Sequence, residues 1–199
     1  MGDQLDKATP SEGLLAKAAE GDKDAFETLV SRHQTSVLNL IYRFIGNRAD
    51  AEDLAQEVFL RVWQAARTYK PKAKFTTWIY RITINLCFNE LKSTRRKKLF
   101  LFRRSRGEVP GRDDEYFTEH AEKISSPEDL LLSAERNRQI LNAFQQLPAN
   151  QRMALVLKRF EGLSYQEIGQ ILGCSVSAVD SLLVRAKRNL REKLTSYEK

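Results

Sequence analysis

The sequence is short of the residues that several classes of protein require. Its 199 residues include two cysteines, Cys87 and Cys174, and two histidines. Neither cysteine has another Cys or a His beside it at metal-ligand spacing, so we expect both to be small packed residues. No apolar run approaches the roughly 20 residues that cross a bilayer, and residues 1–12 contain no signal-like apolar segment. We therefore expect the protein to stay in the cytosol without inserting into a membrane.

A catalytic constellation is missing as well. His33 lies within an amphipathic stretch and His120 within an acidic one, and neither has a nucleophile beside it. We find no carboxylate cluster, metal-ligand spacing or phosphate-binding loop. The sequence thus predicts no catalytic residue, no metal site, no cofactor and no small-molecule substrate. A nucleic-acid-processing enzyme is the remote alternative.

Positive charge and helix-forming residues are abundant. Lys and Arg number 33 against 26 Asp and Glu, which leaves a net charge of +7. That balance favours a polyanionic partner, with nucleic acid ahead of an anionic membrane. Prolines are scarce, and runs of β-branched residues that alternate apolar and polar are absent. The fold class predicted is therefore all-α.

Apolar residues recur at steps of three and four in the first half of the chain, over residues 24–45, from 48 to about 66, and from about 77 to 94. This spacing predicts three amphipathic helices, the first of which ends at Gly46 and Asn47. The residues predicted to face inward are Phe26, Leu29, Val30, Val37, Leu38, Ile41, Phe44, Ile45, Leu54, Val58, Val62, Ala66, Trp78, Ile79, Ile82 and Leu86.

A run of basic residues followed by acidic ones separates the two halves. The basic residues are Lys92, Arg95, Arg96, Lys97, Lys98, Arg103, Arg104 and Arg106. Helical signals resume at Ser126, where Pro127 fits the first helical position and Asp129 completes a capping box. We predict two small helical domains joined by a flexible linker. The boundaries are an N-terminal extension 1–22, a first domain 23–96, a linker 97–125 and a second domain 126–199.

The second domain contains the pattern of a helix-turn-helix over residues 163–188. Ser164 and Glu167 form a capping box, Leu163 and Ile168 take the positions of a hydrophobic staple, and Gly173 permits a left-handed turn. A helical hairpin with a solvated charged face is the alternative. The second helix would present to a major groove Ser177, Asp180, Ser181, Val184, Arg185 and Arg188. Three more would reach phosphates: Lys187, Arg191 and Lys193.

Two polar faces stand out in the first domain. On its second helix, steps of three and four place on one face Asp53, Gln56, Glu57 and Arg61. On its third helix, one face carries Arg81, Asn85, Asn89 and Lys92, with Tyr80, Ile84 and Phe88 predicted beside them. Amides, aromatic planes and positive charge together suit a nucleic-acid strand with unstacked bases. For the face on the second helix the alternative is an ordinary solvated surface.

The segments 50–63 and 75–85 resemble the core-binding and promoter-melting helices of the extracytoplasmic-function (ECF) group of RNA polymerase sigma factors. The helix-turn-helix resembles that family's second DNA-binding module, and the likeness covers about residues 24–194. It implies that Asp53, Gln56 and Glu57 dock on the clamp coiled coil of the largest polymerase subunit. Asn85 would then read a flipped base of the melted upstream promoter element.

The resemblance implies further roles. The loop 69–76 would help to hold the flipped base, with phosphate contacts from Lys70, Lys72 and Lys74. Trp78 is only a secondary candidate for that site. Its position in the predicted inward stripe favours an ordinary core tryptophan. The linker would thread toward the active-site and RNA-exit channels of the polymerase, or act only as a tether. An anti-sigma factor, often membrane-anchored in this family, would cover the same surfaces.

Asp180 and Leu182 depart from the family, since many similar proteins carry basic residues there. Promoter sequence is therefore not transferable. Asp180 would be repelled by phosphates or would accept a hydrogen bond from a cytosine amino group. A stand-alone helix-turn-helix regulator that ignores polymerase is the rival interpretation, and the Asp53, Gln56 and Glu57 face discriminates between the two.

Overall fold

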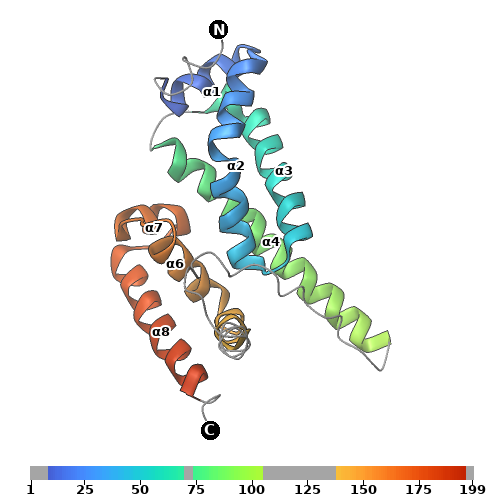
Figure 1. The fold of residues 1–199 in the computed structure, drawn as a ribbon, viewed down its shortest axis with the longest axis vertical. Helices are drawn as coiled ribbons and strands as arrows, with labels where there is room; N and C mark the ends of the chain where they lie inside the picture. Colours follow the sequence, from blue (N-terminus) through green and yellow to red (C-terminus); the bar gives the residue numbers. More distant parts are fainter. Residues whose placement is uncertain (1–8, 70–73, 105–137, 196–199) are drawn as a thin grey trace, which may run out of the picture. The chain divides into compact units, whose positions relative to one another are not determined.

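The structure is a computed structural model that describes residues 9–69, 74–104 and 138–195, with residues 95–104 described by their backbone alone. Every regular element within these ranges is a helix, which confirms the all-α prediction (Figure 1). The first group of helices comprises α1 (Ser11–Ala19), α2 (Lys23–Ile45), α3 (Arg48–Ala65), the 3-10 turn η1 (Ala66–Thr68) and α4 (Phe75–Arg104). Residues 138–145 are also helical, and they precede α6 (Ala149–Arg159), α7 (Tyr165–Leu172) and α8 (Val176–Thr195).

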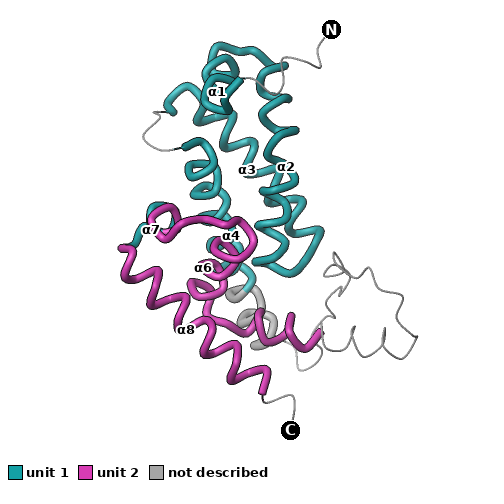
Figure 2. The backbone as a smooth tube through the Cα atoms, turned by 60° about the vertical axis from the view of Figure 1, so that its left-hand side comes forward, with its two compact units in different colours: residues 1–107, 169–174 teal, residues 108–168, 175–199 magenta. Residues whose placement is uncertain are grey.

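The chain divides into two compact units, residues 1–107 with 169–174 and residues 108–168 with 175–199 (Figure 2). The predicted capping box at residues 126–129 and most of the predicted linker lie outside the described residues. Helix α4 continues to Arg104, past residue 94 where the sequence placed its end. In the described part of the chain, no single helix is long and apolar enough to cross a membrane; only α7 and α8 taken together, across a 97° bend, pass the same test.

Local signals set the ends of the first helices. The Asp22 side chain accepts a hydrogen bond from the Ala25 N–H at the start of α2, and the Asn47 side chain accepts from the Asp50 N–H at the start of α3. Gly46 adopts a φ of 80° and ends α2, as predicted. The antiparallel helices α2 and α3 both pack on α4.

The core of this bundle, formed by α1 to α4, differs from the predicted stripe at several positions. Five predicted residues on α2 and α3 are only partly buried: Phe26, Val30, Leu38, Ile45 and Leu54. On α4 the same holds for Trp78 and Ile82, whereas Phe75, Tyr80 and Ile84 are buried instead. Cys87 is buried as predicted, while Cys174 is partly exposed. The reason is that apolar residues surround much of each helix, so the period is evident in the sequence but its rotational phase is not.

Helix α1 is an element that the sequence analysis did not predict within residues 1–22. It packs on α2 and η1 through Leu14, Leu15 and Ala18, which are almost completely buried. It lies at the end of the bundle where α4 begins (Figure 1). The first unit is therefore a bundle closed at one end by a short helix.

The C-terminal helices are held by a second set of apolar contacts. Met153 and Leu157 of α6 and Val179 and Leu183 of α8 are buried where these helices pack together. Val156 of α6 is buried as well, whereas Phe160, which follows the last residue of this helix, is 44% exposed.

Candidate functional site

The predicted polar face of α3 is accessible along its length. Asp53, Gln56 and Arg61 are exposed, and Glu57 is half-buried. Glu57 Oε1 lies 2.8 Å from Arg61 Nε, an exposed pair one helical turn apart. Such a pair stabilises a helix by only about 0.2–0.5 kcal/mol, so it does not prevent either charge from binding a partner. The face presents carboxylate, amide and guanidinium groups side by side.

Beside this face the structure contains a groove that the sequence analysis missed. It is a cavity of about 740 Å³ between α2 and α3. Its apolar wall consists of Phe26, Val30, Leu38, Phe59, Leu60 and Trp63.

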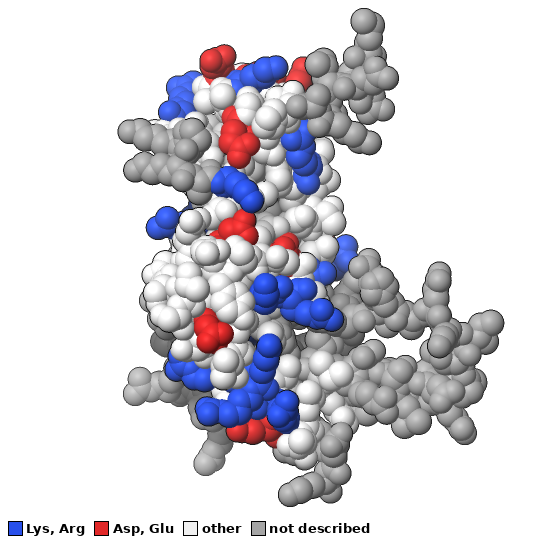
Figure 3. Space-filling model, turned by 90° about the vertical axis from the view of Figure 1, so that its left-hand side faces the viewer, with Lys and Arg blue, Asp and Glu red and all other residues white. Residues whose placement is uncertain are grey.

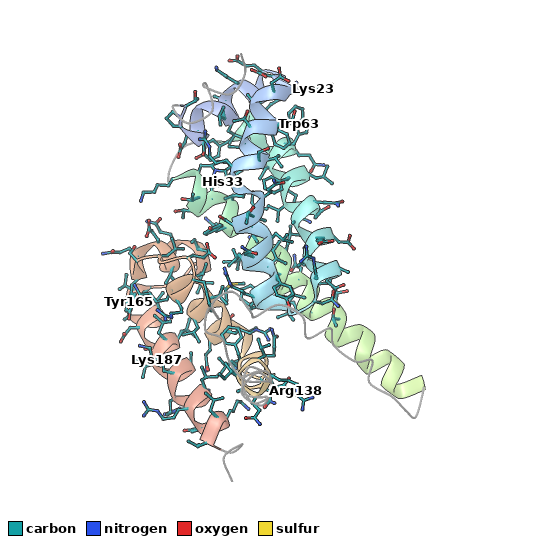
Figure 4. The ribbon with its side chains drawn as sticks, viewed as in Figure 1. Lys23, His33, Trp63, Arg138, Tyr165 and Lys187 are labelled. Carbon is teal, nitrogen blue, oxygen red and sulfur yellow. The ribbon has the colours of Figure 1, made fainter. Side chains whose placement is uncertain are left out.

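Gln56 and Glu52 line the same groove, so it continues into the polar face of α3. Trp63, which Figure 4 labels, remains 37% exposed. Its ring meets that of Phe26 edge-on, with centroids 4.8 Å apart. Leu60 is 56% exposed. The signal in the sequence was the surplus of apolar residues on α2 and α3 beyond the number that one inward stripe accommodates.

The predicted polar stripe on α4 is confirmed as a surface. Arg81, Asn85, Asn89 and Lys92 are all exposed and follow one another at steps of four, four and three residues, so they share one helix face. Lys74 is exposed just before the helix begins. The stripe thus runs for several turns from the start of α4.

The residues predicted beside this stripe are placed differently. Tyr80 and Ile84 are buried in the bundle, and Phe88 packs against Phe44 with ring centroids 5.5 Å apart. Trp78 is only partly buried, and it lies three and seven residues before Arg81 and Asn85, on their face. Trp78 is therefore only partly in the core, and it is an aromatic residue on the same helix face as these amides.

Trp78 is held by two other rings at the start of α4. Its ring centroid lies 4.7 Å from that of Tyr69 and 5.7 Å from that of Phe75. Burial raises the pKa of the Tyr69 hydroxyl above its usual value of 10.0, with a smaller contribution from the Glu12 carboxylate, so Tyr69 stays neutral at ordinary pH. Lys70 and Lys72, predicted to contact phosphates, lie outside the described residues.

The helix-turn-helix forms as the sequence predicted. The Ser164 N–H donates to Glu167 Oε2 at 3.0 Å, and the Glu167 N–H donates to Ser164 Oγ at 3.2 Å, which is a complete capping box. Gly173 has a φ of 68°, and the Cys174 N–H donates to the Gly169 carbonyl at 2.9 Å. Ser175 Oγ accepts from the Ala178 N–H at the start of α8.

The outer face of α8 is polar and accessible. The residues predicted to meet a major groove are all exposed: Ser177, Asp180, Ser181, Val184, Arg185 and Arg188. The Arg185 Nε donates to the Ser181 carbonyl at 3.0 Å, and Arg188 lies 3.8 Å from Glu192. Lys187 and Arg191 are exposed as well, and Figure 3 shows Lys and Arg side chains gathered over the part of the surface where α8 lies. A polyanion is the partner that this charge favours.

Within the described part of the chain no cluster of three or more His, Cys, Asp or Glu residues is arranged to hold a metal ion. His33 is buried, and its imidazole shares a 2.9 Å hydrogen bond with Ser11 Oγ. Burial lowers the pKa of His33, the Arg32 charge lowers it further, and Glu12 opposes the shift. This histidine is a packed structural residue.

Two regions of the chain match described protein families. Residues 29–97 match the family described as Sigma-70 region 2, and residues 137–190 match the one described as Sigma-70, region 4. The chain is 37% identical over 183 residues to the RNA polymerase sigma-H factor of Pseudomonas aeruginosa, covering 91% of this chain and 92% of that one. It is 33% identical to the ECF RNA polymerase sigma-E factor of Escherichia coli K12, with the same coverage.

Two solved structures share the fold. CnrH, in complex with the cytosolic domain of CnrY, aligns with a TM-score of 0.64 and 25% identity, over 94% of this chain and 97% of CnrH. The sigma factor RpoE of Bartonella quintana, in complex with the anti-sigma factor NepR, aligns with a TM-score of 0.59 and 24% identity, over 85% of this chain and 96% of RpoE.

The chain therefore belongs to the sigma-70 family of RNA polymerase sigma factors, in its ECF group. It is an alternative sigma factor, which binds the RNA polymerase core and directs transcription initiation at specific promoters. This family initiates transcription without being catalytic itself.

Proposed function

We propose that the groove between α2 and α3, together with Asp53, Gln56, Glu57 and Arg61, is the surface that binds the polymerase core. The occupant is the clamp coiled coil of the largest subunit. A helical partner needs an apolar strip for its buried side and polar groups at the rim. The continuity of the groove with the polar face through Gln56 supports this assignment more than any other observation.

The test is core binding and transcription with the double variant Gln56→Ala/Glu57→Ala. We expect its Kd for the core to rise about tenfold or more, as for truncation of central interface residues. Glu192→Ala is a matched control, because Glu192 also forms an exposed pair with an arginine one turn away but lies on α8. Equal core affinity of the double variant and wild type would contradict the assignment. If wild type itself ignores the core, the stand-alone regulator is the better interpretation.

The melted upstream promoter element binds, in this proposal, along α4. Asn85 reads the edge of a flipped base, because a side-chain amide offers both donors and an acceptor. Trp78 supplies a plane for stacking, while Lys74, Arg81, Asn89 and Lys92 supply donors for phosphates and bases. The common face of these residues on one helix supports the assignment.

The distal promoter element binds as duplex along the outer face of α8. Ser177, Asp180, Ser181, Val184 and Arg185 are offered to base edges, and Arg188 extends the same face toward the phosphates. Each module binds DNA weakly, and the polymerase joins them, so the effective concentration of the second contact is high. The free protein is therefore expected to have poor promoter specificity.

An anti-sigma factor is the remaining partner in the proposal. RpoE of Bartonella quintana was solved in complex with the anti-sigma factor NepR, and CnrH was solved in complex with the cytosolic domain of CnrY. A partner that fills the α2–α3 groove would compete directly with the core. The protein would act in the cytoplasm, where polymerase and chromosome are found, and would have no catalytic activity of its own.

A further inference from the structure

The start of α4 is capped by a residue from a distant part of the chain. The Trp78 N–H donates to the Lys74 carbonyl at 3.2 Å, so Lys74 occupies the capping position. A lysine side chain has donors only and offers no acceptor to the free N–H groups of the first turn. The acceptor is instead Glu12 of α1, whose Oε1 lies 2.8 Å from the Phe75 nitrogen across 63 residues of sequence.

Glu12 is itself held in place by contacts between α1 and α2. The Arg32 guanidinium donates to the Thr9 carbonyl at 2.8 Å, and His33 shares its hydrogen bond with Ser11, the neighbour of Glu12. The ring of His33, which Figure 4 labels on α2, also lies against that of Phe75, with centroids 4.9 Å apart. His33 of α2 therefore contacts both Ser11 of α1 and the first residue of α4.

The capped turn leads directly into the proposed strand-binding surface. Phe75 is almost completely buried, and its ring packs against that of Trp78. Trp78 lies on the face of α4 that carries Arg81 and Asn85. Asn85 follows two turns later on the same face. The carboxylate of Glu12 also interacts favourably with the positive end of the α4 dipole.

We infer that Glu12 is a positioning residue for capture of the melted strand: it holds the first turn of α4 so that Trp78 and Lys74 are set before DNA arrives. This inference rests on the proposed function of α4. Helix α1 lies outside both family matches, which cover residues 29–97 and 137–190. The groove that binds the core lies between α2 and α3 and contains no residue of α1.

The experiment uses the full chain with core polymerase and a promoter that wild type transcribes. Binding and start-site formation are measured on the intact duplex and on the same DNA with its upstream melted segment already mismatched. Three variants are compared: Glu12→Ala, Glu12→Gln and the control Glu20→Ala at the exposed end of α1. Exchange of the Phe75 amide proton is followed by NMR in parallel.

We expect Glu12→Ala to weaken binding to the mismatched DNA about fivefold, because the first turn of α4 loses the stability of one capping acceptor and must then be ordered when DNA binds. Its affinity for the core should stay within about twofold of wild type, and the Phe75 amide should exchange faster. Glu12→Gln keeps an oxygen acceptor, so it should restore most of the DNA binding. Glu20→Ala should match wild type.

Two results would overturn the inference. One is equal binding of Glu12→Ala and wild type to the mismatched DNA, and the other is a loss of core affinity as large as the loss of DNA binding. If Glu12→Ala does not fold, the test rests on Glu12→Gln, which keeps an acceptor for the Phe75 N–H. A Glu12→Gln variant that folds but no longer binds the mismatched DNA would also refute a role of Glu12 through this hydrogen bond. Failure of wild type to bind the core would instead refute the proposed function.

Discussion

Leu60 provides the sharpest test of the groove, because its side chain is 56% exposed in the free protein and would be covered by the docked polymerase helix. Fully burying a leucine side chain is worth about 1.5–3 kcal/mol, so covering the exposed part contributes about 1–1.5 kcal/mol. Leu60→Ala keeps part of that contact. We therefore expect a loss of about 1 kcal/mol, or roughly a fivefold higher Kd for the core.

The same exposure predicts that the fold hardly changes. The free energy of unfolding of Leu60→Ala should lie within about 0.5 kcal/mol of wild type, as for other exposed positions. The assay is a titration of labelled protein with purified core, followed by anisotropy, next to thermal unfolding. Ile140→Ala is the control, because Ile140 is 41% exposed but lies outside the groove. An unchanged Kd for Leu60→Ala, or the same loss for Ile140→Ala, would refute the docking of a helix in this groove.

Three further predictions concern Asn85 on α4, Asp180 on α8 and the buried His33. Asn85→Ala should relax base preference at one melted position while core affinity is kept, as read by sequencing transcripts from a promoter library; unchanged preference would refute base reading by Asn85. Asp180→Ala should alter preference at one position of the distal duplex by about 1–3 kcal/mol, whereas uniformly tighter binding would show that Asp180 is only repelled by phosphates. Because burial lowers the pKa of His33 below its usual 6.5, the unfolded chain takes up the proton first as pH falls. Stability should therefore drop below about pH 6.5, and His33→Gln should flatten that slope in denaturant unfolding; an unchanged slope would contradict it.

The capping box of the helix-turn-helix shows why some features could be predicted from sequence. Ser164 and Glu167 are three residues apart, and their hydrogen bonds involve only their own turn of chain. The same holds for Gly46 at the end of α2 and for the exposed faces of α3 and α8, since helical periodicity alone places those residues together. Local geometry was sufficient in each case.

The rotation of α4 could not be predicted in the same way. Apolar residues occur on most sides of this helix, so Tyr80 and Ile84 or Trp78 and Ile82 could equally have faced the core. Packing against α2 and α3 selected the first pair. The consequence for function is that Trp78, and not Tyr80, is the ring available beside Asn85.

By itself the sequence determined the helical class, the helix-turn-helix and the polar faces of α3 and α4, because each depends on residues within a few positions of one another. Tertiary structure alone decided the α2–α3 groove and the contact between Glu12 and Phe75. Both require side chains from separate helices to meet in space, and the 63 residues between Glu12 and Phe75 carry no local signal that they will. The physical reason is the hydrophobic effect. Leu14 and Leu15 are buried when α1 packs on α2, and this packing places Glu12 of the same helix beside Phe75.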